Sequence, residues 1–78
     1  MNITEILEKL DARKSAGFQL RKRNGFLTST WLIYKRKGFY YYFDIAQRVE
    51  FVDAYKYTKV ELIDLFDGHW FEIDLGVG

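Results

Sequence analysis

The stretch FQLRKRNGFLTSTWLIYK, residues 18–35, decides the fold that this sequence predicts. Two runs of strand-forming residues flank Asn24-Gly25. Asn-Gly is the strongest short hairpin signal, because a type I′ turn needs a positive φ at both of its central positions. A two-residue loop at this point pairs Arg23 with Phe26 and thereby fixes the register of the whole hairpin.

A second turn follows at residues 36–38, Arg-Lys-Gly. It suits a three-residue hairpin loop in which the glycine is left-handed, and this loop pairs Lys35 with Phe39. A two-residue turn is the alternative, but it would place Asp44 opposite Trp31. The hydrophobic pattern therefore favours the longer loop, and it predicts a meander of three antiparallel strands.

These registers sort the side chains of the meander onto two faces, because successive residues of a strand point to opposite sides. One face takes the apolar residues that would form the core, and the other takes three tyrosines and several charged residues. The apolar face would carry Phe18, Leu20, Leu27, Trp31, Ile33, Phe39, Tyr41, Phe43 and Ile45.

A helix is predicted before the meander, over residues 2–16. Four aliphatic residues at i, i+3, i+4 and i+7 form one apolar stripe. Asn2 with Glu5 three residues later is a capping signal, and Gly17 is the expected left-handed stop. The stripe consists of Ile3, Ile6, Leu7 and Leu10.

A second helix is predicted over residues 58–67. Thr58 and Glu61 have the spacing of a capping box, and Gly68 stops the helix. The alternating residues 69–75 that follow predict a last strand. Its inward-facing side chains would be Phe71, Ile73 and Leu75.

The segment 46–57 is left open between two interpretations. A fourth strand through Val49 and Phe51 would extend the meander, and a helix capped by Asp44 fits nearly as well; the strand is favoured. With either outcome, residues 1–78 predict one two-layer α+β domain. Its order is an N-terminal helix, an antiparallel meander of three to four strands, a second helix and a C-terminal strand.

The composition excludes several classes of protein. Without cysteine there is no disulfide framework and no thiolate zinc site, and no apolar run approaches the roughly 18 residues of a membrane span. The polar residues 1–5 do not predict a signal peptide, so a cytoplasmic location without membrane association is expected. The first 48 residues carry ten Lys and Arg against four acids (+6), and the remainder two Lys against seven acids (−5).

The signals for an enzyme are weak. The single histidine, His69, adjoins a helix stop, where boundary residues are common. Glu61, Asp64 and Asp67 recur at every third position, which would place three carboxylates on one helix face but is also typical of a solvated face. The sequence therefore predicts no catalytic residue, no metal site and no cofactor.

The most informative feature is the face opposite the predicted helices, where tyrosines lie beside arginines and lysines. An exposed aromatic patch rimmed by charge is typical of an interaction site. We expect it to contact another protein or a ribonucleoprotein, and the sequence sets no oligomeric state. The predicted contact residues are Arg21, Arg23, Tyr34, Lys35, Arg36, Lys37, Tyr40 and Tyr42.

Three interpretations of this face compete. A protein partner docks on it, single-stranded nucleic acid stacks on the tyrosines, or the tyrosines belong to the core. The near-neutral net charge of +1 favours a protein over a nucleic acid. The sequence therefore predicts a non-enzymatic binding module that acts by steric occlusion, in the manner of small phage or mobile-element inhibitors such as anti-CRISPR proteins.

Overall fold

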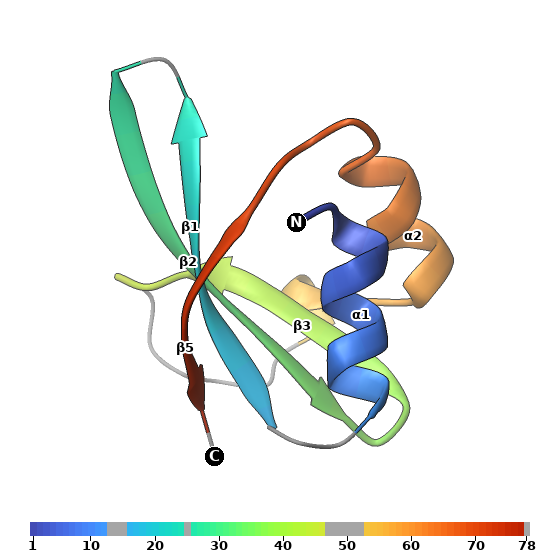
Figure 1. Ribbon diagram of the computed structural model, residues 1–78. Coiled ribbons are helices and arrows are strands. Elements are labelled where there is room, and N and C mark those ends of the chain that lie inside the picture. Colours follow the sequence, from blue (N-terminus) through green and yellow to red (C-terminus); the bar gives the residue numbers. More distant parts are fainter. Residues whose placement is uncertain (13–15, 25, 47–52, 78) are drawn as a thin grey trace.

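Two helices lie against one face of a five-stranded antiparallel sheet (Figure 1). This computed structural model describes residues 1–12, 16–24, 26–46 and 53–77. The strand order is β4-β3-β2-β1-β5, so the last strand returns to pair with the first. The predicted α+β class and order of elements are confirmed. In chain order, the elements are α1 (Ile3–Asp11), β1 (Gly17–Asn24), β2 (Leu27–Arg36), β3 (Phe39–Asp44), a 3₁₀ turn (Asp53–Tyr55), β4 (Lys56–Tyr57), α2 (Lys59–Leu65) and β5 (Glu72–Val77).

Both helices begin as the sequence predicts. The Asn2 side chain accepts a hydrogen bond from the Glu5 amide at 2.9 Å, and the Glu5 carboxylate accepts one from the Asn2 amide. Thr58 and Glu61 form the same reciprocal pair at the start of α2. Each capping box satisfies amides that have no partner within the helix.

The end of α1 differs from the prediction. The helix ends at Asp11 with Ala12 as its C-cap, and residues 13–15 lie outside the described part of the chain. Gly17 is not left-handed; it opens β1 opposite Tyr34. A Cβ at this position would lie 2.5 Å from the Ile33 carbonyl oxygen and from the Tyr34 ring, so the close approach of β2 requires a glycine.

The first hairpin has a different register from the predicted one. Asn24 pairs with Leu27, so the two residues between the strands are Gly25, which lies outside the described residues, and Phe26. The predicted pair of Arg23 with Phe26 is therefore wrong by two positions. A shift of two keeps every side chain on its predicted face, because the side-chain period of a strand is two.

The register of the second hairpin also differs from the predicted one, and this difference changes the face on which its side chains lie. Lys37 and Gly38 have φ values of 52° and 80°, which make a two-residue turn of the type I′ kind, and Arg36 pairs with Phe39. The rejected pairing of Trp31 with Asp44 is the one that forms. Because the error is a single position, every side chain of β3 lies on the face opposite to the predicted one.

The hydrophobic pattern misled this prediction because β3 is apolar on both faces. Its four residues from Tyr40 to Phe43 are all at least 90% buried. A strand covered on both sides reads as a continuous apolar run, so alternation carries no information about its register. The turn type, which matches the twist of the flanking strands, decides instead.

The turn gives a direct stability prediction. A left-handed lysine costs about 1 kcal/mol more than a residue that tolerates this conformation, such as asparagine. We expect Lys37→Asn to raise the free energy of unfolding by about 0.5–1 kcal/mol in urea titrations. Lys37→Ala removes the same side chain without gaining tolerance and should show no increase; equal gains in the two variants would contradict the turn assignment.

Two hydrophobic clusters lie on the two sides of the sheet. The main core joins both helices to the face of Leu20, Ile33, Tyr40 and Tyr42. On the other face Leu32, Tyr41 and Phe43 are buried, with Tyr34 and Tyr55 packed against them.

The predictions for residues 46–57 and for the last strand are each met only in part. The predicted strand through Val49 and Phe51 falls in residues 47–52, outside the described residues, although Lys56–Tyr57 do pair with β3 as β4. In β5, a register shift opposite Gln19 and Leu20 pairs Leu75 with Gln19. Leu75 therefore points away from the helices and is half exposed, which corrects its predicted inward position.

Candidate functional site

The eight predicted contact residues do not form one surface. Tyr40 and Tyr42 are only 3% and 7% exposed and lie in the main core beneath the helices, because the register of β3 is reversed. Lys35 shares their face. On the other face, Tyr34 packs against the cluster of Leu32, Tyr41 and Phe43, where its ring stacks on Phe43 at 5.9 Å. Of the rest, Arg21, Arg23 and Arg36 lie on that same face, and Lys37 lies in the turn.

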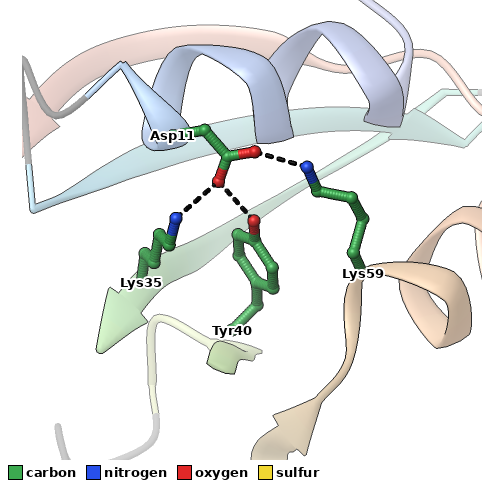
Figure 2. A network of polar contacts seen from close by, with 4 residues as sticks. All are labelled: Asp11, Lys35, Tyr40 and Lys59. Carbon is green, nitrogen blue, oxygen red and sulfur yellow. Dashed lines mark hydrogen bonds and ion pairs between the residues drawn. The ribbon is translucent and has the colours of Figure 1, made fainter. Parts of the chain in front are cut away.

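Lys35 and Tyr40 instead belong to a polar network centred on Asp11, at the end of α1 (Figure 2). Lys35 Nζ lies 2.8 Å from Asp11 Oδ1, and the Tyr40 hydroxyl donates to the same oxygen. Lys59, at the start of α2, donates to the other oxygen. One carboxylate thus joins both helices to β2 and β3, so this group of predicted contact residues has a structural role.

The network makes the stability depend on pH. The hydrogen bonds from Lys35, Lys59 and Tyr40 hold the pKa of Asp11 well below its usual range. A carboxyl group with a lowered pKa stabilises the fold above its unfolded pKa of about 3.9, and this contribution is lost as the pH falls through the folded pKa.

We expect Asp11→Asn to lower the free energy of unfolding by about 1 kcal/mol at pH 7, a figure reduced for the partial exposure of the lysines. The difference from the wild type should shrink as the pH falls below about 4. Urea titrations at pH 7 and pH 3 measure it, with Asp64→Asn on the exposed side of α2 as the control. A difference that is the same at both pH values would contradict the role of the ionised carboxylate.

The described residues contain a different candidate site at the far end of the first hairpin. β5 pairs with β1 only from Gly17 to Arg21, and β3 pairs with β2 only from Trp31 onward. The paired residues Lys22–Asn24 and Leu27–Ser29 therefore stand out from the sheet as a two-stranded arm (Figure 1). An isolated two-stranded hairpin is marginally stable at best, so this hairpin arm is not explained by folding alone.

The tip of the hairpin arm is apolar and exposed. Phe26 is as accessible as in an isolated peptide, and Leu27 is 75% exposed. A fully exposed phenylalanine on a projecting element contributes nothing to the core and is typical of a contact residue.

A pocket of about 600 Å³ opens beside the hairpin arm, between β1 and the segment that links α2 to β5. The indole of Trp70, in its wall, is 65% exposed. We call it the arm pocket. Its lining consists of Arg21, Lys22, Arg23, Gly68, His69, Trp70 and Glu72.

The three cations of the arm pocket differ in their partners. Arg21 forms an ion pair with Asp74, with Nε 3.0 Å from Oδ1. The Lys22 ammonium lies over the rings of Phe66 and Phe71, at 5.4 and 5.8 Å from their centroids. Within the described ranges neither Lys22 nor Arg23 has a carboxylate partner. The arm pocket therefore presents two uncompensated positive charges beside an exposed indole.

A second, smaller pocket of about 400 Å³ adjoins this site on the helix side of the sheet. Lys22 and His69 line both pockets, and the second one is otherwise mostly aromatic, including Trp31 and Tyr42. These two rings stack at 5.0 Å and are nearly parallel. Its lining combines two buried rings, Tyr42 and Phe66, with exposed residues such as Leu65. We assign the candidate site to the arm pocket and the arm tip, because the exposed indole of Trp70 lies there beside two cations that lack a carboxylate partner among the described residues.

Lys22, Phe26 and Trp70 were not predicted as contact residues. Arg21 to Arg23 is a run of three cations next to a turn, which was a usable signal for Lys22. Trp70 lies within the predicted strand of residues 69–75, on the side opposite the inward-facing Phe71 and Ile73, so the alternation was a usable signal for its exposure.

His69 and the carboxylates of α2 do not assemble into a metal site. No group of three or more His, Asp or Glu side chains that could hold an ion occurs in the part of the chain that the structure describes. The His69 ring instead packs edge-on against Phe66, with centroids 5.6 Å apart.

Comparisons with protein-family models, with curated proteins and with solved structures found no significant match for this chain. Among the described residues, neither helix is long and apolar enough to cross a membrane. A function must therefore be proposed from the side chains and their geometry.

Proposed function

We propose that this protein is a non-enzymatic binding module that acts by occupying the surface of another protein. The observation that carries the proposal is the exposed Phe26 at the tip of the hairpin arm, next to an arm pocket that holds Arg23 and Trp70. Tryptophan and arginine are enriched among the residues that dominate binding energy, and phenylalanine is enriched at interfaces. The contact surface is thus the end of the arm, in place of the tyrosine face that the sequence suggested.

A projecting two-stranded arm suits steric occlusion. It can enter a concave site on a partner while the rest of the domain blocks access around it, and this needs no chemical step. In its narrower form the proposal is a cytoplasmic, stoichiometric inhibitor of the kind that phages and mobile elements encode, including anti-CRISPR proteins. The exposed arm tip and the cations of the arm pocket support this form, because binding through them requires no catalytic group.

The experiment is affinity capture from the native host with the tagged protein, followed by an activity assay of the captured partner. We expect a single macromolecular partner whose activity falls in proportion to added protein and reaches its minimum at a fixed stoichiometry. A partner that is turned over or modified, or a partner whose activity never changes, would contradict steric occlusion.

Single-stranded nucleic acid is the second candidate ligand, because Trp70 could stack on a base while Lys22 and Arg23 contact phosphates. Two carboxylates count against it: Glu72 lines the same pocket, and Asp74 already pairs with Arg21. Affinity for oligonucleotides that falls steeply with salt would favour this alternative.

A further inference from the structure

The outer edge of β1 is open beside the arm pocket. β2 pairs with the whole of β1, from Gly17 to Asn24, but the last described pair with β5 is that of Arg21 with Glu72. Before Glu72 the chain turns away toward α2 (Figure 1). Phe71 holds it there, because its ring is completely buried and its amide donates to the Met1 carbonyl at 2.7 Å.

The backbone of Arg23 points into this opening. In an antiparallel ladder, successive residues direct their N–H and C=O groups to alternate neighbours. The Lys35 amide donates a hydrogen bond to the Ala16 carbonyl at 3.0 Å. The backbone N–H and C=O groups of the even-numbered residues of β1 therefore point toward β2, and those of the odd-numbered residues point away from it. Arg23 is the odd-numbered residue beyond the last β5 pair, and it therefore offers one donor and one acceptor to an added strand.

The positive charge beside this open edge favours an added strand that carries carboxylates. Lys22 and Arg23 lack carboxylate partners among the described residues, whereas Asp74 compensates Arg21. The Lys22 ammonium is held over two aromatic rings at the border of the pocket, which fixes its position for a charged ligand. An acidic segment that enters here meets two cations, one on each side of the strand, and one acid, Glu72.

We propose that the arm pocket takes an extended acidic segment of the partner protein, which adds as a strand at the β1 edge. The segment exchanges backbone hydrogen bonds with Arg23 and offers carboxylates on its two faces, one to the Lys22 ammonium on the helix side and one to the Arg23 guanidinium on the other side, with Trp70 packed along it. This inference rests on the proposed function, since it names the chemistry of the partner at the same surface. A peptide fits this opening better than a nucleic acid, because the free backbone groups are those of a strand edge.

The first experiment selects ligands without assuming a partner. Random heptapeptides displayed on phage, and separately a pool of random single-stranded DNA, are selected on the intact protein. We expect the peptides to become rich in Asp and Glu and poor in Pro, and the DNA pool to give no enriched family. Basic peptides, no enrichment, or selection of DNA alone would overturn the proposal.

The second experiment separates the backbone contact from the side chain. Arg23→Ala removes the guanidinium and keeps the amide, whereas Arg23→Pro removes both. Because this amide does not face β2, proline leaves the β1–β2 ladder intact. We expect the best selected peptide to bind Arg23→Pro about tenfold more weakly than Arg23→Ala, and Lys22→Gln more weakly than the wild type. Lys9→Gln, an exposed cation on α1, serves as the control and should bind normally.

A third measurement keeps the proposal testable if Arg23→Pro fails to fold. Hydrogen exchange of the Arg23 amide in the wild-type protein should slow when the selected peptide is added. An unchanged exchange rate, or equal binding by the proline and alanine variants, would overturn strand addition. If a captured partner still depends on Phe26 and Trp70 in that case, the proposed function stands and only the strand model fails.

Discussion

Replacing both Tyr40 and Tyr42 with alanine will unfold the protein. Both rings are buried in the main core, and Tyr42 contacts Trp31 at 5.0 Å and Phe66 at 4.7 Å. Removal of one large buried ring costs about 3–5 kcal/mol. A domain of this length has a total stability of roughly 4–12 kcal/mol, so the loss of two rings approaches or exceeds it.

Circular dichroism during a urea titration measures this loss. The matched control is Phe26→Ala with Leu27→Ala, which also removes two large apolar side chains, but from the exposed arm tip. The control should keep the wild-type midpoint, while the tyrosine variant should lack a folded baseline. A tyrosine variant with a wild-type midpoint would contradict the register of β3 and restore the surface that the sequence predicted.

Replacing both Phe26 and Trp70 with alanine is expected to weaken binding of the captured partner by more than about 100-fold. Phe26 is a fully exposed ring at the tip of the arm, and Trp70 is a largely exposed ring in the same pocket as the charges of Lys22 and Arg23. Residues that dominate an interface typically cost about 2 kcal/mol or more when truncated to alanine, and every 1.4 kcal/mol changes the dissociation constant tenfold.

Isothermal titration calorimetry measures the dissociation constant, and thermal melting checks that both variants remain folded. The control is Val60→Ala with Leu75→Ala, two exposed apolar residues on α2 and β5. If Phe26 and Trp70 belong to the interface, only their loss should weaken binding. An unchanged dissociation constant for the Phe26 and Trp70 variant would place the interface elsewhere.

The sequence was sufficient to predict the elements and their order, because each has a local cause. Asn2 with Glu5 and Thr58 with Glu61 form their capping boxes as expected, and Gly68 adopts its left-handed conformation after α2. Such signals depend only on neighbours within a turn of helix, so tertiary packing did not override them.

The register of β3 could not be predicted from its side chains. All four residues from Tyr40 to Phe43 are apolar or aromatic, and both faces of this strand are covered, so no solvent-facing position marks the alternation. The aspartate that argued against the true register, Asp44, ends the strand and accepts a hydrogen bond from the Ala46 amide. It therefore needed no place in the core.

The position of the candidate site could not be predicted, because it depends on which part of β1 lacks β5 as a neighbouring strand. β5 stops pairing with β1 at Arg21 because Phe71 enters the core. This depends on tertiary packing, which local sequence signals do not report. The exposure of Phe26 and Trp70 follows from the same departure of the chain, since it leaves the arm uncovered. Of the eight predicted residues, Arg21 and Arg23 line the arm pocket, while Lys35 and Tyr40 join the network around Asp11.

The most direct test is a hydrogen-exchange footprint of the protein in complex with its captured partner. The account predicts that protection increases in the hairpin arm, at Lys22–Asn24 and Phe26–Leu27, and in the segment from Gly68 to Glu72. Protection that increases instead on α1 and α2, with exchange in the arm and the arm pocket unchanged, would contradict the claim that the end of the arm is the contact surface.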